Sequence, residues 1–104
     1  MRDYWNNAPE VDVEAVAAAT IELIKSAQPL TYWEMQEFRN SSELCDRGHF
    51  GRMVEVVAAK VGAKVPAGLD VVLEDPDFDV RISFMKAVVD AVDPMPAGVR
   101  AKRG

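Results

Sequence analysis

The stretch that decides the fold is residues 75–94, DPDFDVRISFMKAVVDAVDP. Its large apolar side chains recur at alternating steps of four and three residues, which is the spacing of one face of an α-helix; they are Phe78, Ile82, Met85, Val89 and Val92. Asp75 followed by Pro76 has the form of an N-cap and a proline in the first helical turn. The sequence therefore predicts a helix of about seventeen residues that ends at Asp93.

The same region allows a second interpretation. Residues 71–73 and 80–82 could pair as a small β-hairpin, because short runs of β-branched residues on either side of a turn are typical of hairpins. Residues 63–74 are ambiguous by themselves, since they suit a short helix or a short strand. The helical spacing of the following stretch holds over four consecutive steps, so the helix is favoured and a hairpin at about 71–82 remains the alternative.

The clearest helix start in the sequence is Thr31. Glu34 follows three residues later, and the two residues together form a capping box. Leu30 before the cap and Met35 at the fourth helical position have the form of a hydrophobic staple. The sequence predicts that a helix begins at Thr31.

The aromatic residues of this helix divide between two sides. The spacing places Tyr32 with Met35 and Phe38 on one side, whereas Trp33 points to a second contact or to the surface. Two more aromatic residues precede the first predicted helix, where they could cover the core or anchor a protein partner. Because Trp and Tyr are favoured at the centres of interfaces, three residues are candidates for binding a partner: Tyr4, Trp5 and Trp33.

Helical spacing also predicts a first helix over about residues 9–27. Pro9 suits its first turn, and Glu10, Asp12 and Glu14 suit the positive end of the helix dipole.

The middle of the chain predicts two further helices. Asn40 followed by Glu43 repeats the capping pattern and predicts a short turn of helix to about residue 46, which Gly48 stops. A longer helix then extends over about residues 49–61, and Gly62 is its expected end.

These segments predict an all-α fold, a compact bundle of four to five helices. We expect a single helical domain over residues 1–97, followed by a short basic tail over residues 98–104. The predicted core consists of Ile21, Ile24, Phe38, Phe50, Val54, Val57, Ile82, Met85 and Val89.

The composition limits the class of protein. The chain has 104 residues, 12 Lys and Arg, 17 Asp and Glu, and a net charge of −5. Up to residue 97 it holds nine basic and seventeen acidic residues, a net charge of −8, which disfavours non-specific binding to nucleic acid. The sequence has no long apolar stretch, and its one cysteine cannot form an intramolecular disulfide. We expect a cytoplasmic protein without a membrane span.

Two groups of residues suggest metal sites but are incomplete. Cys45 and His49 are four residues apart and could supply two zinc ligands, yet no other cysteine or histidine exists to complete a set. The acidic residues at 75, 77 and 79 match the first positions of a calcium loop, but Val80 stands where that loop requires glycine and Lys86 where it requires glutamate. The sequence predicts no metal, no cofactor and no catalytic residues, so we do not expect an enzyme.

A helix-turn-helix regulator that binds DNA is the alternative function. Residues 31–39 could form the first helix, and a segment that begins near Ser41 or His49 the second. Basic residues surround this region, although acidic residues are interleaved with them; the basic ones are Arg39, Arg47 and Arg52.

The favoured function rests on the acidic residues. Five of them lie within ten positions: Asp70, Glu74, Asp75, Asp77 and Asp79. Such a cluster can steer a basic surface over about 8–10 Å at physiological salt. We therefore expect a small acidic protein that binds another protein as an adaptor, an inhibitor or an assembly subunit, one version being a phage-type acidic decoy. The acidic candidates for partner binding are Glu74, Asp77 and Asp79.

Overall fold

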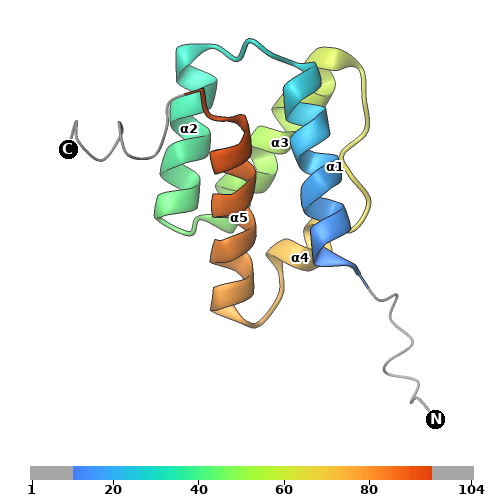
Figure 1. Cartoon of the computed structure of the whole chain (residues 1–104), viewed down its shortest axis with the longest axis vertical. Coiled ribbons are helices and arrows are strands. Elements are labelled where there is room, and N and C mark those ends of the chain that lie inside the picture. Colours follow the sequence, from blue (N-terminus) through green and yellow to red (C-terminus); the bar gives the residue numbers. More distant parts are fainter. Residues whose placement is uncertain (1–10, 95–104) are drawn as a thin grey trace.

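The computed structural model describes residues 11–94, and these residues form five α-helices and no strand (Figure 1). The helices are α1 (Val13–Ser26), α2 (Tyr32–Glu43), α3 (Arg47–Val61), α4 (Leu69–Leu73) and α5 (Phe78–Val92). Helix α5 lies between α2 and α1, α3 packs behind it, and the short α4 closes the end where α1 and α5 begin. The predicted all-α bundle is confirmed.

The alternative hairpin is wrong. Residues 71–73 lie in α4 and residues 80–82 lie in the first turns of α5. Three apolar residues of α4 are buried and pack into the core instead of pairing with another strand; they are Leu69, Val72 and Leu73. The predicted tail, residues 98–104, lies outside the described residues.

Three phenylalanine rings form the centre of the core. Phe50 of α3 is fully buried between Phe38 of α2 and Phe84 of α5, with ring centroids 5.6 and 6.1 Å from its own. Both contacts are edge to face, which is a favourable arrangement for aromatic rings. These contacts join three helices at one point.

The predicted core is confirmed except at Ile21 and Ile82, which are only partly buried. The buried face of α5 is made up of Phe84, Met85, Val88, Val89 and Val92. Phe78, at the start of α5, is 52% exposed. The first turns of α5 extend past the end of α2 (Figure 1), so α2 cannot cover the apolar residues there.

Helix α1 begins later than the sequence predicts. Asp12 has an extended backbone and is the N-cap of α1, and its Oδ1 accepts hydrogen bonds from the N–H groups of Glu14 (3.0 Å) and Ala15 (3.3 Å). Asp12 therefore caps the helix instead of lying in its first turn. Residues 9 and 10 of the predicted helix lie outside the described residues.

Helix α2 begins as predicted. Thr31 Oγ1 accepts a hydrogen bond from the N–H of Glu34 (3.0 Å), and Glu34 Oε1 accepts one from the N–H of Thr31 (2.9 Å), which completes the capping box. Glu34 Oε1 also accepts a hydrogen bond from Lys60 Nζ (2.7 Å), so the cap of α2 is joined to the last turn of α3.

The predicted cap at Asn40 is wrong, because α2 continues through this residue to Glu43. The two serines that follow Asn40 are buried, and each donates its hydroxyl to a carbonyl oxygen three residues earlier, at 3.0 Å. These internal hydrogen bonds satisfy the hydroxyls without breaking the helix.

Helix α3 begins at Arg47, two residues earlier than predicted. Asp46 is its N-cap and accepts a hydrogen bond from the N–H of His49 (3.1 Å), so Gly48 lies within the helix and does not end one. At the other end Gly62 adopts the left-handed conformation (φ 70°) and terminates α3, as predicted.

Helix α5 is capped by Asp77 and not by Asp75. Asp77 Oδ1 accepts a hydrogen bond from the N–H of Asp79 (2.9 Å), and Asp75 Oδ1 accepts one from the N–H of Asp77 (2.8 Å). Both aspartates are residues that commonly cap a helix, and Asp77 is the one that caps α5. Pro76 therefore precedes the helix.

The C-terminal end of α5 is hydrogen-bonded to α2 and to the loop between α1 and α2. Arg39 donates two hydrogen bonds to the carboxylate of Asp93, from Nε (2.8 Å) and from Nη2 (2.7 Å), and both side chains are largely buried. The hydrogen bonds that Arg39 donates to Asp93 hold the pKa of Arg39 above its usual value, against the opposing effect of burial. Gln28 Nε2 also donates to the carbonyl oxygen of Val92 (3.0 Å).

The cap at Thr31 gives a first prediction. We expect Thr31→Ala to lower the free energy of unfolding by about 1 kcal/mol, because the N–H of Glu34 loses its acceptor. Urea unfolding followed by circular dichroism measures the loss. Thr31→Ser keeps the acceptor and is the matched control; an equal loss in both variants would show that the cap is not the cause.

Glu34 makes stability depend on pH. Burial raises the pKa of Glu34, but hydrogen bonds from Lys60 and Thr31 outweigh it and place the pKa below its usual range. The ionised carboxylate therefore stabilises the fold at neutral pH, and this contribution is lost as the pH falls below the usual glutamate value of about 4.3.

We expect the difference in free energy of unfolding between the wild type and Glu34→Gln to be largest near pH 7. It should shrink as the pH is lowered through 4 to 3 in urea unfolding experiments. Glutamine can still accept the hydrogen bond from the N–H of Thr31, so the comparison isolates the charge. A difference that stays constant over this pH range contradicts the assignment.

Candidate binding surfaces

The most exposed aromatic residues described lie side by side in the sequence at the start of α2. Tyr32 is 79% exposed and Trp33 is 56% exposed. Tyr32 lines the same recess as Met35, on one side of α2 as the spacing predicts, but Tyr32 is exposed whereas Met35 and Phe38 are buried. Side chains of a helix lean toward its N-terminus, so the first residue extends beyond the layer that covers the core.

An apolar recess adjoins Tyr32. It has a volume of about 320 Å³ and is lined by Gln28, Pro29, Leu30, Thr31, Tyr32, Met35, Arg39 and Pro94. Leu30 and Met35, the predicted hydrophobic staple, both contribute to its wall. Its charged residue, Arg39, is already engaged by Asp93, so the recess is suited to an apolar side chain.

The acidic candidates lie at the other end of the bundle. Glu74, Asp77 and Asp79 are exposed in and beside the turn between α4 and α5. Within residues 11–94 none of the three forms an ion pair. Helix α5 has 15 residues, which is roughly 22 Å of length, and it separates this turn from the start of α2 (Figure 1). The structure therefore does not bring the acidic candidates together with Trp33.

The other two aromatic candidates, Tyr4 and Trp5, lie outside the described residues. A contact between them and Trp33 stays a prediction.

Cys45 and His49 do not share a helix face. Cys45 lies in the turn before α3, with a left-handed backbone (φ 52°) and its side chain against the core. His49 lies in α3 and pairs with Glu37 of α2. In the part of the chain that the structure describes, no group of three or more His, Cys, Asp and Glu residues could hold a metal ion.

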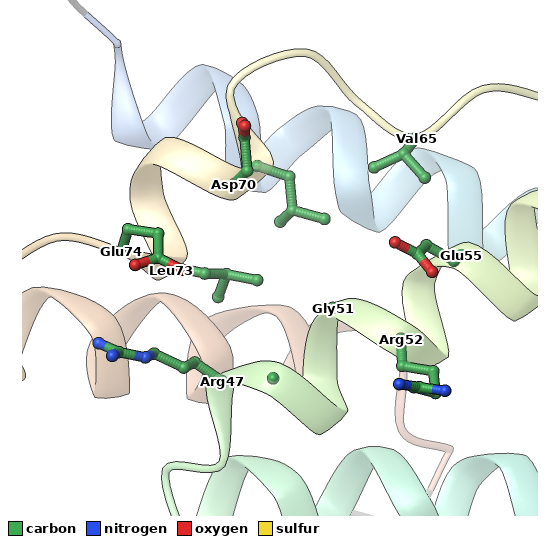
Figure 2. Close-up of a pocket in the computed structure, with 10 residues that line it drawn as sticks. Arg47, Gly51, Arg52, Glu55, Val65, Asp70, Leu73 and Glu74 are labelled. Carbon is green, nitrogen blue, oxygen red and sulfur yellow. The ribbon is translucent and has the colours of Figure 1, made fainter.

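Helices α2 and α3 are joined by three residues, 44–46, as in a helix-turn-helix. The start of α3 is not a uniformly basic surface, however. Arg47 and Arg52 line a pocket of about 300 Å³ between α3 and α4, and three carboxylates line the same pocket (Figure 2). They belong to Glu55, Asp70 and Glu74. A DNA backbone at this face would meet negative charge.

This pocket was not predicted from the sequence. Its upper wall in Figure 2 is α4, a segment whose sequence suits a helix or a strand equally well. The sequence feature that could have indicated the pocket is the pair of glycines at positions 48 and 51 of α3. A helix without side chains at these positions allows another group to approach its backbone closely.

Comparison with known proteins gives no relative: no family model matches the chain, and no curated protein or solved structure matches it. Among residues 11–94, no helix combines the length and the apolar character needed to cross a membrane.

Proposed function

We propose that the protein acts by binding another protein, as an adaptor, an inhibitor or an assembly subunit in the cytoplasm. The observation that carries the proposal is the pair of exposed aromatic residues, Tyr32 and Trp33, at the start of α2. Large aromatic side chains contribute much of the binding energy in protein interfaces, and Trp and Tyr are enriched among the residues that dominate it.

The position of this pair favours binding for a second reason. The capping box and the link from Glu34 to Lys60 fix the first turn of α2, so its backbone need not become ordered when a partner binds. Preorganisation of this kind reduces the entropy that association costs. The recess beside Tyr32 can take an apolar side chain of the partner.

We expect the double variant Tyr32→Ala and Trp33→Ala to lose affinity for the partner by at least tenfold, because the aromatic contacts are removed. Quantitative mass spectrometry of proteins retained from the native lysate by the immobilised full chain identifies the partner, and titration of that purified protein measures the affinity.

Leu44→Ala is the matched control. Leu44 is 77% exposed and follows the C-terminal end of α2. Its substitution therefore removes an exposed apolar side chain that lies outside the proposed surface. The proposal fails if the double variant and Leu44→Ala retain the same proteins with the same affinity.

The acidic turn between α4 and α5 supports a partner with a basic surface. Exposed carboxylates without ion pairs keep their full attraction for a partner, and they act mainly on the rate of encounter. An acidic decoy that occupies a nucleic-acid-binding surface is one form of this proposal. It predicts that association slows when the charges are removed.

We expect the triple variant Glu74→Gln, Asp75→Asn and Asp79→Asn to bind the purified partner with a slower on-rate and a weaker dependence on salt. Asp77 is left unchanged because it caps α5, so the helical circular dichroism spectrum should be preserved. Stopped-flow measurements at low and at physiological salt test this. An unchanged on-rate at low salt removes the acidic turn from the proposal.

A DNA-binding regulator is supported less well. The three-residue turn between α2 and α3 favours it, but the carboxylates of α4 oppose phosphate binding at the start of α3.

A further inference from the structure

A groove of about 480 Å³ runs along the surface between α1 and α5, the two helices that begin at the same end of the bundle (Figure 1). Much of its lining is apolar. Phe84 lines the groove and is buried, and three further lining residues are partly buried: Val13, Ala17 and Val80. The groove between α1 and α5 therefore offers apolar contact to a partner.

The charged residues that line this groove are both acidic. They are Glu14, in the first turn of α1, and Asp79, in the first turn of α5, and both are exposed. Neither forms an ion pair with any residue between 11 and 94. The basic residues of α1 and α5 do not line the groove; they are Lys25, Arg81 and Lys86. The charge of the groove therefore has one sign.

Acidic residues in the first turn of a helix also stabilise that helix through its dipole. This role accounts for Glu14 and Asp79 one at a time, but it does not require the two carboxylates to line one groove. Because α1 and α5 begin at the same end of the bundle, both carboxylates lie at one end of the groove. A basic group at that end would be attracted by both.

The small residues of the groove suit a helix as its occupant. Ala17, Ser83 and Ala87 leave room for the backbone of a third helix, and packed helices lie about 8–10 Å apart. From Asp79 to Ala87 the groove extends over eight residues of α5, which is roughly 12 Å or about two helical turns. A helix antiparallel to α1 and α5 places its last turn at the carboxylates, and basic residues are favoured in that turn by the dipole of the helix.

We propose that the groove between α1 and α5 binds an amphipathic helix of a partner protein. The apolar face of this helix lies on Phe84, and basic residues in its last turn pair with Glu14 and Asp79. The acidic turn between α4 and α5 adjoins the same end of the groove and adds attraction over a longer range. The inference rests on the proposed binding of another protein, and it does not depend on Tyr32 and Trp33.

The probe is the peptide acetyl-SAQLAQQLAQLAQKKA-amide. Its leucines recur at steps of four and three, as in helices that bind apolar grooves, and two lysines follow in the last turn. The control peptide, acetyl-SAQLAQQLAQLAQQQA-amide, keeps the leucines and lacks the charges. We expect titration of the full chain, labelled with nitrogen-15, to shift the backbone amide signals of Ala17, Ser83 and Ala87. We expect the charged peptide to bind at least fivefold more tightly than the neutral one at low salt.

Variants of the full chain separate the two kinds of contact. Glu14→Gln and Asp79→Asn should each weaken binding of the charged peptide at least threefold and leave binding of the neutral peptide unchanged. Ala87→Gln should weaken binding of both peptides at least fivefold, because the longer side chain occupies the groove. Ala59→Gln makes the same change at an exposed position of α3 and is the matched control. Circular dichroism checks that each variant is folded.

The double variant Tyr32→Ala and Trp33→Ala keeps this test separate from that of the aromatic surface. It should bind the charged peptide as the wild type does, whatever proteins it retains from a lysate. Loss of the peptide in this variant would place the peptide at the start of α2 and overturn the inference. Equal binding of the two peptides, shifts confined to other helices, or full binding by Ala87→Gln would do the same.

The basic residues near the end of this sequence are a competing occupant of the groove. Without peptide, replacing Arg100, Lys102 and Arg103 by glutamine should leave the amide signals of Ser83 and Ala87 unchanged. Shifts of these signals would assign the groove to the chain's own tail instead of a partner.

Discussion

The edge-to-face contacts of Phe50 with Phe38 and Phe84 are the constraint on which the rest of the structure depends. They bring α2, α3 and α5 to one point and so fix the distances among three helices. Helix α1 then covers the open side of α5, and α4 closes the end between α1 and α3. The exposed aromatic residues at the start of α2 and the charged residues of the pocket between α3 and α4 lie outside this core, so they can change without rebuilding it.

The ion pairs between helices have a different role from the aromatic core. A buried pair gains little net free energy over apolar residues of the same shape, but removing one partner is costly. The pair of Arg39 with Asp93 therefore specifies where the end of α5 meets α2. The pair of Glu34 with Lys60 is more accessible, since 36% of the Lys60 side chain is exposed, and it joins the start of α2 to the end of α3.

The sequence predicted features that depend on a few neighbouring residues. The capping box at Thr31 and the left-handed Gly62 are of this kind, and both are confirmed. Prediction from the sequence failed where two neighbouring residues were equally suited to the same role, as Asp75 and Asp77 are to capping α5. It also failed where packing between distant segments decided the outcome. The exposure of Tyr32 depends on how far the core extends toward the end of α2, and the pocket beside Gly48 depends on where α4 packs.

The fastening of α5 by Arg39 and Gln28 has a practical consequence for labelling the protein. Pro94, the last described residue, lines the recess beside Tyr32, whereas Val11 lies near α4 at the opposite end of the bundle (Figure 1). A fluorophore or affinity tag attached directly after Pro94 starts next to the aromatic surface. One joined before α1 starts roughly the length of a helix away, which makes it the better site for immobilising the chain.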